Sequence, residues 1–187
     1  MLIRKPDTVS YLLRAGLVLL CIGLSLSPLE SNASDEKLER VKIAFIYKFL
    51  GVTEWIEEAH HGSSSELAIG VAGDKRMLSR FSVLSGKFVS KRRLSINSID
   101  PKQHRVEAIS VLYVSKPNQK HLDQLYAGLA NASVLTITEG DREMLQSTMI
   151  VLYKKNGYIR FDINNTLARS RGIKLNAKLL ELAGKVI

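Results

Sequence analysis

The sequence predicts a single-domain α/β fold: a mainly parallel or mixed sheet with helices on both faces and a C-terminal antiparallel hairpin. Two observations predict this class. Apolar runs of strand length alternate with segments in which apolar residues recur every three or four positions. Near the end, Asn156 and Gly157 separate the runs 149–153 and 158–163, and Asn-Gly between two such runs is a strong hairpin signal.

The elements are predicted in order along the chain. Residues 35–55 carry an apolar residue at every third or fourth position, which predicts the first helix, with Ser34 and Asp35 as its cap. Residues 67–72 are apolar throughout and end at a glycine, which predicts a buried strand. The same criteria predict strands at 93–99, 109–114, 134–138, 149–153 and 158–163, helices at 75–84, 118–129, 166–171 and 176–186, and a helical turn at 141–145.

Residues 1–33 have the features of a secretory signal peptide. Arg4, Lys5 and Arg14 are basic, residues 15–26 are apolar, and Ser-Asn-Ala at 31–33 supplies small residues for cleavage. About a dozen apolar residues are too few to cross a bilayer, so a retained anchor is the less favoured alternative. We therefore expect a protein of the bacterial periplasm, exported by a cleavable signal, whose domain is residues 34–187 and has no transmembrane segment.

The mature chain is basic and free of cysteine. Residues 1–33 contain three of the 27 basic and two of the 18 acidic residues, which leaves 24 against 16 and a net charge of +8. Export excludes nucleic acid, so the acidic counterpart would be lipid head groups or an acidic protein surface, unless the basic surface is only solvated. The one cysteine, Cys21, lies in the predicted signal, so no disulfide or thiol chemistry is expected.

No pattern of residues predicts catalysis, a cofactor or a metal. The glycines near Asp74 lack both the three-glycine fingerprint and the lysine of a phosphate loop, which favours an ordinary strand-helix turn over a nucleotide site. His60 and His61 lie in a polar loop without converging ligands. No serine lies in a Gly-x-Ser-x-Gly context. We therefore expect a protein that is not an enzyme and that acts by binding another protein.

Four groups of residues resemble the YfiR family of periplasmic proteins, in the family's order and over essentially the whole mature chain. The groups are residues 41–49 (Val-Lys-Ile-Ala-Phe-Ile-Tyr-Lys-Phe) with Trp55, residues 134–138 (Val-Leu-Thr-Ile-Thr), residues 158–164 (Tyr-Ile-Arg-Phe-Asp-Ile-Asn), and residues 172–175 (Gly-Ile-Lys-Leu) before Leu179, Leu180 and Ala183. The resemblance implies a mixed α/β fold, a homodimer and a regulatory role. Relatives bind the periplasmic sensor domain of an inner-membrane diguanylate cyclase and repress it, which lowers cyclic di-GMP signalling and biofilm formation.

The chain departs from the family's pattern at three points. It has Ile56 where relatives commonly have proline, Asp162 where glutamate is usual, and no cysteine in the mature domain, whereas relatives often carry disulfides. These departures bear on the identity of the partner and on redox control. The candidate partner-binding residues are a C-terminal group, Phe161, Asp162, Asn164, Leu167, Ile173 and Leu175, and a second group, Tyr47 and Trp55.

Some of these candidates also have a purely structural interpretation. Leu167, Ile173 and Leu175 could pack on the sheet, which is the favoured reading, and Asn164 could cap the helix that follows. Two other functions remain open: a periplasmic small-molecule-binding sensory module acting on another membrane signalling protein, with a pocket at the strand ends, and an exported hydrolase of unrecognised type.

Overall fold

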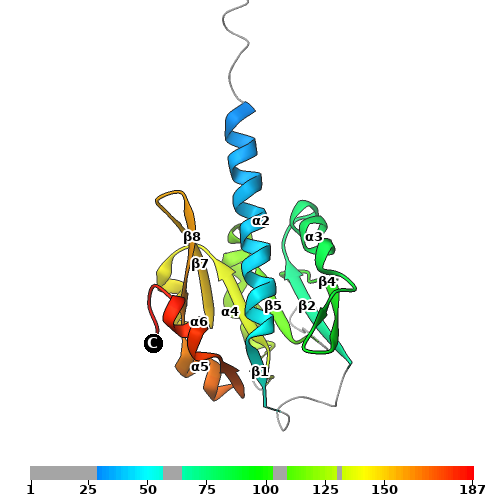
Figure 1. Ribbon diagram of the computed structural model, residues 1–187, viewed down its shortest axis with the longest axis vertical. Helices are drawn as coiled ribbons and strands as arrows, with labels where there is room; N and C mark the ends of the chain where they lie inside the picture. Colours follow the sequence, from blue (N-terminus) through cyan, green and yellow to red (C-terminus); the bar gives the residue numbers. More distant parts are fainter. Residues whose placement is uncertain (1–28, 57–64, 103–108, 130–131) are drawn as a thin grey trace, which may run out of the picture. The chain divides into compact units, whose positions relative to one another are not determined.

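The computed structural model describes residues 29–56, 65–102, 109–129 and 132–187 (Figure 1). Its main sheet has seven strands in the order β3-β4-β2-β5-β6-β7-β8; neighbouring inner strands are parallel, and the outermost strand on each side is antiparallel to its neighbour. The strands are β2 (Glu66–Ala72), β3 (Phe88–Val89), β4 (Arg92–Ser98), β5 (Val111–Val114), β6 (Leu135–Glu139), β7 (Ile150–Lys155) and β8 (Tyr158–Ile163). The predicted fold class is confirmed.

Helices cover both faces of this sheet because the strand side chains alternate between two hydrophobic cores. In β5, Val111 and Tyr113 belong to the first core, and Leu112 and Val114 belong to the second. The first core lies under α2 (Leu29–Gly51) and also receives side chains from α3 (Lys75–Phe81), α5 (Asn165–Ser170) and α6 (Ala177–Leu182). The second core lies under α4 (Leu122–Ala127), which the 3₁₀ helix η3 (Lys116–His121) precedes.

The first helix differs from the prediction at both ends. The chain divides into two compact units at Lys37 and Leu38, and α2 is helical in both. It begins at Leu29, so Ser34 and Asp35 lie inside the helix and do not cap it. Residues 1–28, most of the predicted signal peptide, lie outside the described residues, as do His60, His61 and His104.

The predicted helix also ends earlier than expected, at Gly51. Thr53 Oγ1 donates a hydrogen bond of 2.7 Å to the carbonyl oxygen of Phe49, one of the carbonyls left free at the helix end. Residues Thr53–Trp55 then form β1, which pairs antiparallel with β9 (Ile173–Leu175) in a separate two-stranded sheet. The helix expected through Trp55 was therefore too long, because the pairing partner of this short strand lies far away in the sequence.

The predicted hairpin is confirmed, and a second one lies at the opposite edge of the sheet. β7 and β8 pair antiparallel across Asn156 and Gly157, whose φ values are 51° and 79°. β3 and β4 pair across Ser90 and Lys91, whose φ values are 47° and 67°. Both turns therefore place two consecutive residues in the left-handed region.

The C-terminus contains the other departure from prediction. A helix was expected over residues 176–186, but α6 ends at Leu182. The following residues lie along the outer edge of β8: Gly184 N donates to Phe161 O (2.8 Å), Ile163 N to Lys185 O (2.9 Å), and Ile187 N to Ile163 O (3.0 Å). We call Gly184–Ile187 the C-terminal tail. It covers part of an edge strand that would otherwise expose its backbone groups.

Candidate partner-binding surface

The structure places five of the six C-terminal candidates in the protein interior. Phe161 is only 4% exposed, and its ring lies 4.9 Å from the ring of Phe49 between centroids. Asn164 is buried as well; its side chain accepts a hydrogen bond of 2.8 Å from Leu167 N and so caps α5. The other buried members are Asp162, Ile173 and Leu175. The core interpretation of Ile173 and Leu175 therefore agrees with the structure, and these five side chains do not form an exposed patch.

Leu167 is the sixth candidate and lies half-buried at the surface. It lines a small cavity of about 40 Å³ beside α4 and α5, together with Tyr126 and Arg171. Tyr126 Oη lies 2.9 Å from Thr148 Oγ1, and burial raises the pKa of the Tyr126 phenol. This cavity has room for a few water molecules.

Asp162 is a buried carboxylate held by two side chains. Its side chain is fully buried, and it accepts hydrogen bonds from Arg142 Nε and, at 3.0 Å, from Tyr153 Oη. The Arg142 guanidinium also lies 5.1 Å from the centre of the Tyr153 ring. Burial and the hydrogen bond to Asp162 raise the pKa of the Tyr153 phenol. A buried charge requires such a partner, so Arg142 keeps the interior of this edge electrically balanced.

Gly184 lies directly against this group. A Cβ atom at Gly184 would be 2.5 Å from Tyr153 Oη and 2.8 Å from Asp162 Oδ1. Such approaches are too close for carbon, so only glycine fits while the C-terminal tail stays paired with β8. The position of the tail is therefore linked to the Asp162 hydrogen bonds.

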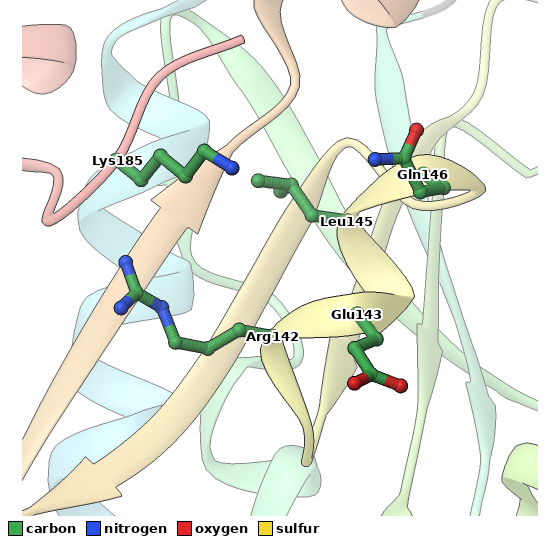
Figure 2. Close-up of a pocket in the computed structure, with 5 residues that line it drawn as sticks. All are labelled: Arg142, Glu143, Leu145, Gln146 and Lys185. Carbon is green, nitrogen blue, oxygen red and sulfur yellow. The ribbon is translucent and has the colours of Figure 1, made fainter.

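A surface cavity of about 290 Å³ adjoins the same group. It is lined by Arg142, Glu143, Leu145, Gln146 and Lys185. Figure 2 shows the side chains of Arg142 and Lys185 reaching toward the same space from the 3₁₀ helix η4 (Arg142–Gln146) and from the tail, while Glu143 points away. Two cations at the mouth of a partly apolar cavity favour an acidic or anionic group as its occupant.

Two exposed apolar side chains lie close to Lys185 in the sequence. Leu182, the last residue of α6, is 74% exposed, and Val186 in the tail is also exposed. We use the name C-terminal face for Arg142, Leu182, Lys185 and Val186. The sequence pattern did not single out these four residues, because three of them lie in the segment that was predicted to continue as a helix.

The second group of candidates, Tyr47 and Trp55, lies on a different part of the molecule. Both are half-buried, and both contact the β3–β4 hairpin. Tyr47 Oη donates to the carbonyl oxygen of Phe88 (3.2 Å), and the Arg92 guanidinium lies 4.6 Å from the centre of the Trp55 ring. Burial lowers the pKa of Arg92. The structure thus joins these two aromatic residues to a hairpin that the sequence reasoning had not connected with them.

A buried polar cluster at the carboxyl ends of β5 and β6 was also missed. Lys42 on α2 forms ion pairs with Glu139 and, at 2.6 Å, with Glu39. Arg80 on α3 lies 3.5 Å from Glu39, and Tyr113 Oη donates to Glu139 at 2.8 Å. Burial and the charge of Glu139 raise the pKa of the Tyr113 phenol well above its ordinary value. Two carboxylates balance two cations here, so the cluster anchors α2 and α3 to the sheet.

The glycine of β2 and the turn that follows this strand have structural explanations. A Cβ at Gly70 would lie 2.8 Å from the Ile99 side chain, so this glycine is needed for close packing. Asp74 accepts a hydrogen bond of 2.8 Å from Met77 N and caps α3. In the part of the chain that the structure describes, no three His, Cys, Asp or Glu side chains are grouped to hold a metal ion. Within the same ranges, no helix combines the length and apolar character needed to span a bilayer.

Comparison with known proteins places this chain in a family. The YfiR/HmsC-like family model matches residues 39–184, which is most of the chain and the whole of the sheet. Members of this family are regulators and not enzymes, and they are associated with the control of membrane diguanylate cyclases. No curated protein matches the chain. On the extent of the family match, the chain belongs to the YfiR/HmsC-like family.

Proposed function

We propose that this chain is a periplasmic regulatory protein that binds the sensor domain of an inner-membrane diguanylate cyclase and represses it. The consequence would be lower cyclic di-GMP signalling and less biofilm formation. Family membership supports the regulatory role and the link to cyclases. Residues 1–33, with their basic and apolar segments, support export through a cleavable signal. As part of the same proposal, the exported chain forms a homodimer.

The observation that carries the proposal is the C-terminal face. Arg142 is 49% exposed although it neutralises a fully buried carboxylate, and Lys185 lies beside it at the cavity mouth. Leu182, three positions before Lys185 in the sequence, is mostly exposed. Exposed apolar side chains together with exposed cations are typical of a protein-binding surface, where a few anchors provide most of the affinity. The buried candidates Phe161, Asp162 and Asn164 would then act by holding this face in position.

Repression requires no chemistry on the part of this chain. A bound protein shifts the equilibrium between an active and an inactive sensor domain by the difference between its affinities for the two states. Shifting that equilibrium tenfold therefore needs a difference of about 1.4 kcal/mol in binding free energy. An interface of ordinary size can supply such a difference.

The test is affinity capture by the exported protein, purified from the full gene in the form in which it is secreted. The protein is immobilised and exposed to detergent-solubilised inner membranes, and the retained proteins are identified. We expect a membrane diguanylate cyclase whose conversion of GTP to cyclic di-GMP slows when the protein is added. Leu182→Glu and Lys185→Glu should lose most of the capture. Tyr158→Glu, at a comparably exposed position next to the β7–β8 turn, should capture as well as wild type.

Three results would contradict this proposal. Capture of a sensor that has no cyclase activity would mean that the chain binds a membrane protein but does not control cyclic di-GMP synthesis. Equal capture by Leu182→Glu and wild type would mean that the partner does not bind at the C-terminal face. A capture that fails with wild type and with every variant would favour a protein that binds a small molecule.

The second candidate function is that of a small-molecule-binding sensory module. The cavity of about 290 Å³ near Arg142 and Lys185 favours it, because the volume fits a small organic anion. Binding to the native state raises the melting temperature by mass action, so a thermal-shift screen of small carboxylates and phosphates tests this function. A rise that Lys185→Glu abolishes would support it, and no rise with any compound would exclude these ligand classes.

A further inference from the structure

The segment from Lys75 to Ile99 is strongly and uniformly basic. These 25 residues contain seven basic residues and no acidic residue: Lys75, Arg76, Arg80, Lys87, Lys91, Arg92 and Arg93. The segment comprises α3, the 3₁₀ helix η2 (Ser82–Leu84), β3 and β4. Arg80 is used internally, in its ion pair with Glu39, and Arg93 stands opposite Glu66 in the β2–β4 register. Lys87 and Lys91, on either side of β3, are exposed.

The same segment exposes two large apolar side chains. Phe88 is 63% exposed and Val83 is 60% exposed, whereas their neighbours Leu84 and Val89 are buried. The backbone of Phe88 is held in place, because its carbonyl oxygen accepts the hydrogen bond from Tyr47 Oη. The phenyl ring therefore projects outward from a fixed point of the hairpin.

Aromatic rings hold two of the cations of this segment. Lys87 Nζ lies 5.6 Å from the centre of the Tyr47 ring, and the Arg92 guanidinium lies 4.6 Å from that of Trp55. Each geometry is that of a cation over the face of an aromatic ring, which limits the motion of a long side chain. Tyr47 and Trp55 thus act as positioning residues for the basic hairpin.

The turn of this hairpin has a lysine at a position whose backbone conformation suits glycine or asparagine better. Ser90 and Lys91 adopt φ values of 47° and 67°, a left-handed region that residues other than glycine and asparagine rarely occupy. The β7–β8 hairpin makes a comparable turn with Asn156 and Gly157, which tolerate it well. Strain of this kind, at an exposed tip, indicates that the cation itself has a use.

We propose that the β3–β4 hairpin and η2 form a membrane-binding surface that recognises the anionic head groups of phospholipids. Cations on both sides of β3 would meet the negative surface charge, and Phe88 would enter the head-group region, as aromatic side chains do at membrane interfaces. An acidic protein is the less favoured occupant, because a stable protein interface buries more apolar area than two side chains provide. The proposal does not depend on the identity of the cyclase partner.

Vesicle binding tests the proposal directly. The secreted form of the protein is sedimented with vesicles of phosphatidylcholine alone and with vesicles that contain about 30 mol% phosphatidylglycerol. We expect clear partition only with the anionic vesicles, falling steeply as salt is added. One surface cation contributes about fivefold in partition, so Lys91→Glu should lower the coefficient by tenfold or more. Phe88→Ser should also lower it, because the ring no longer enters the interface.

The opposite hairpin provides a matched control. Lys155 and Tyr158 are exposed there, a lysine and an aromatic residue flanking a turn at the other edge of the sheet. Lys155→Glu and Tyr158→Ser should leave the partition unchanged. Phe88→Trp should show a blue-shifted fluorescence component with anionic vesicles, and Tyr158→Trp should not. Thermal melts establish that each variant is folded, which is expected because all of these side chains lie at the surface.

Several results would overturn the proposal. Equal partition into both kinds of vesicle, or an equal loss in the control variants, would show that the contact is not made by this hairpin. A protein that ignores anionic vesicles but binds soluble polyglutamate through Lys91 would have an acidic protein as its partner, and not a lipid surface.

Discussion

The two edges of the main sheet have the same strand arrangement but differ in their turns, in the length of the outer strand and in what covers it. Each ends in an antiparallel strand reached through a tight turn. At the β8 edge the turn is Asn-Gly, the strand is six residues long, and the C-terminal tail pairs along its outer side. At the β3 edge the turn is Ser-Lys, the strand has two residues, and a phenylalanine projects from it.

The two edges differ in how much they contribute to the stability of the fold. The β8 edge buries Phe161 and Asp162 and satisfies the backbone of β8 with the tail, all of which favours the folded state. The β3 edge retains a strained turn, an exposed ring and concentrated positive charge, none of which stabilises a monomer. We infer that the β8 edge maintains the fold and the face beside it, and that the β3 edge carries features kept for contact with another surface.

The largest expected effect compares the two edge phenylalanines. Phe161→Ala should lower the free energy of unfolding by about 3 to 5 kcal/mol, because it removes a ring packed against Phe45 and Phe49. Phe88→Ala should change it by less than about 0.5 kcal/mol, because the ring is mostly exposed. Urea denaturation followed by circular dichroism measures both. Similar losses in the two variants would mean that the two edges do not differ in the way described.

The next effect concerns the C-terminal tail. Gly184→Ala should cost about 1 to 3 kcal/mol, because the added methyl group would overlap Tyr153 Oη and Asp162. Gly51→Ala is the matched control, since nothing lies within 4 Å of the position its Cβ would take. Hydrogen exchange at Ile163 should rise in Gly184→Ala as the tail separates from β8. Unchanged protection at Ile163 would show that the tail does not cover this edge.

Exchanging the residues of the two turns should change the free energy of unfolding by a smaller amount, with opposite signs at the two edges. Ser90→Asn with Lys91→Gly should stabilise the protein by about 1 kcal/mol, because residues suited to left-handed φ replace strained ones. Asn156→Ser with Gly157→Lys should destabilise it by about the same amount. Chemical denaturation of the two double variants against wild type provides the measurement. A loss of stability in the first variant would mean that the Ser-Lys turn has no strain to relieve.

The smallest effect is a pH dependence at the β8 edge. Burial and the hydrogen bond to Asp162 raise the pKa of Tyr153 above its ordinary value of about 10. A raised pKa means that the folded state favours the neutral phenol, so this contribution is complete below pH 10 and is lost as pH rises through the raised pKa. Tyr153→Phe should therefore lose stability less steeply than wild type between pH 9 and pH 11. Parallel curves for the two proteins would contradict the assignment.

Most of the fold followed from local patterns in the sequence. β2 and β5 read as apolar runs because both of their faces are buried, and Asn156-Gly157 predicted the β7–β8 hairpin from two residues. β4 is partly exposed, and the two-residue strand β3 was missed. β1 and β9 were missed because a three-residue strand has no periodicity of its own and is defined by its partner. The helix expected through Val186 ended early because the tail gains backbone hydrogen bonds from β8 instead.

The candidate site was less predictable, for a related reason. Asp162 was expected at the surface because an isolated carboxylate is usually exposed. The alternation in β8 stops at Phe161, and the three residues from there to Ile163 are all buried. Arg142 and Tyr153 make burial of Asp162 possible, and they lie 20 and 9 positions away in the sequence. Contacts between residues so far apart in the sequence do not change the local pattern of apolar residues. The exposed residues of the C-terminal face were therefore also overlooked.

The pairing of β1 with β9 has a consequence for the order of folding. Glu54 and Lys174, which pair at 3.1 Å, are 120 positions apart in the sequence, and the edge of β8 is completed only by Gly184–Ile187. Neither the β1–β9 sheet nor the paired part of the outer edge of β8 can therefore form before residues 173–187 are in place. Because contacts between residues far apart in the sequence form slowly, we expect the β1–β9 sheet to form late in folding, after the local strand-helix units.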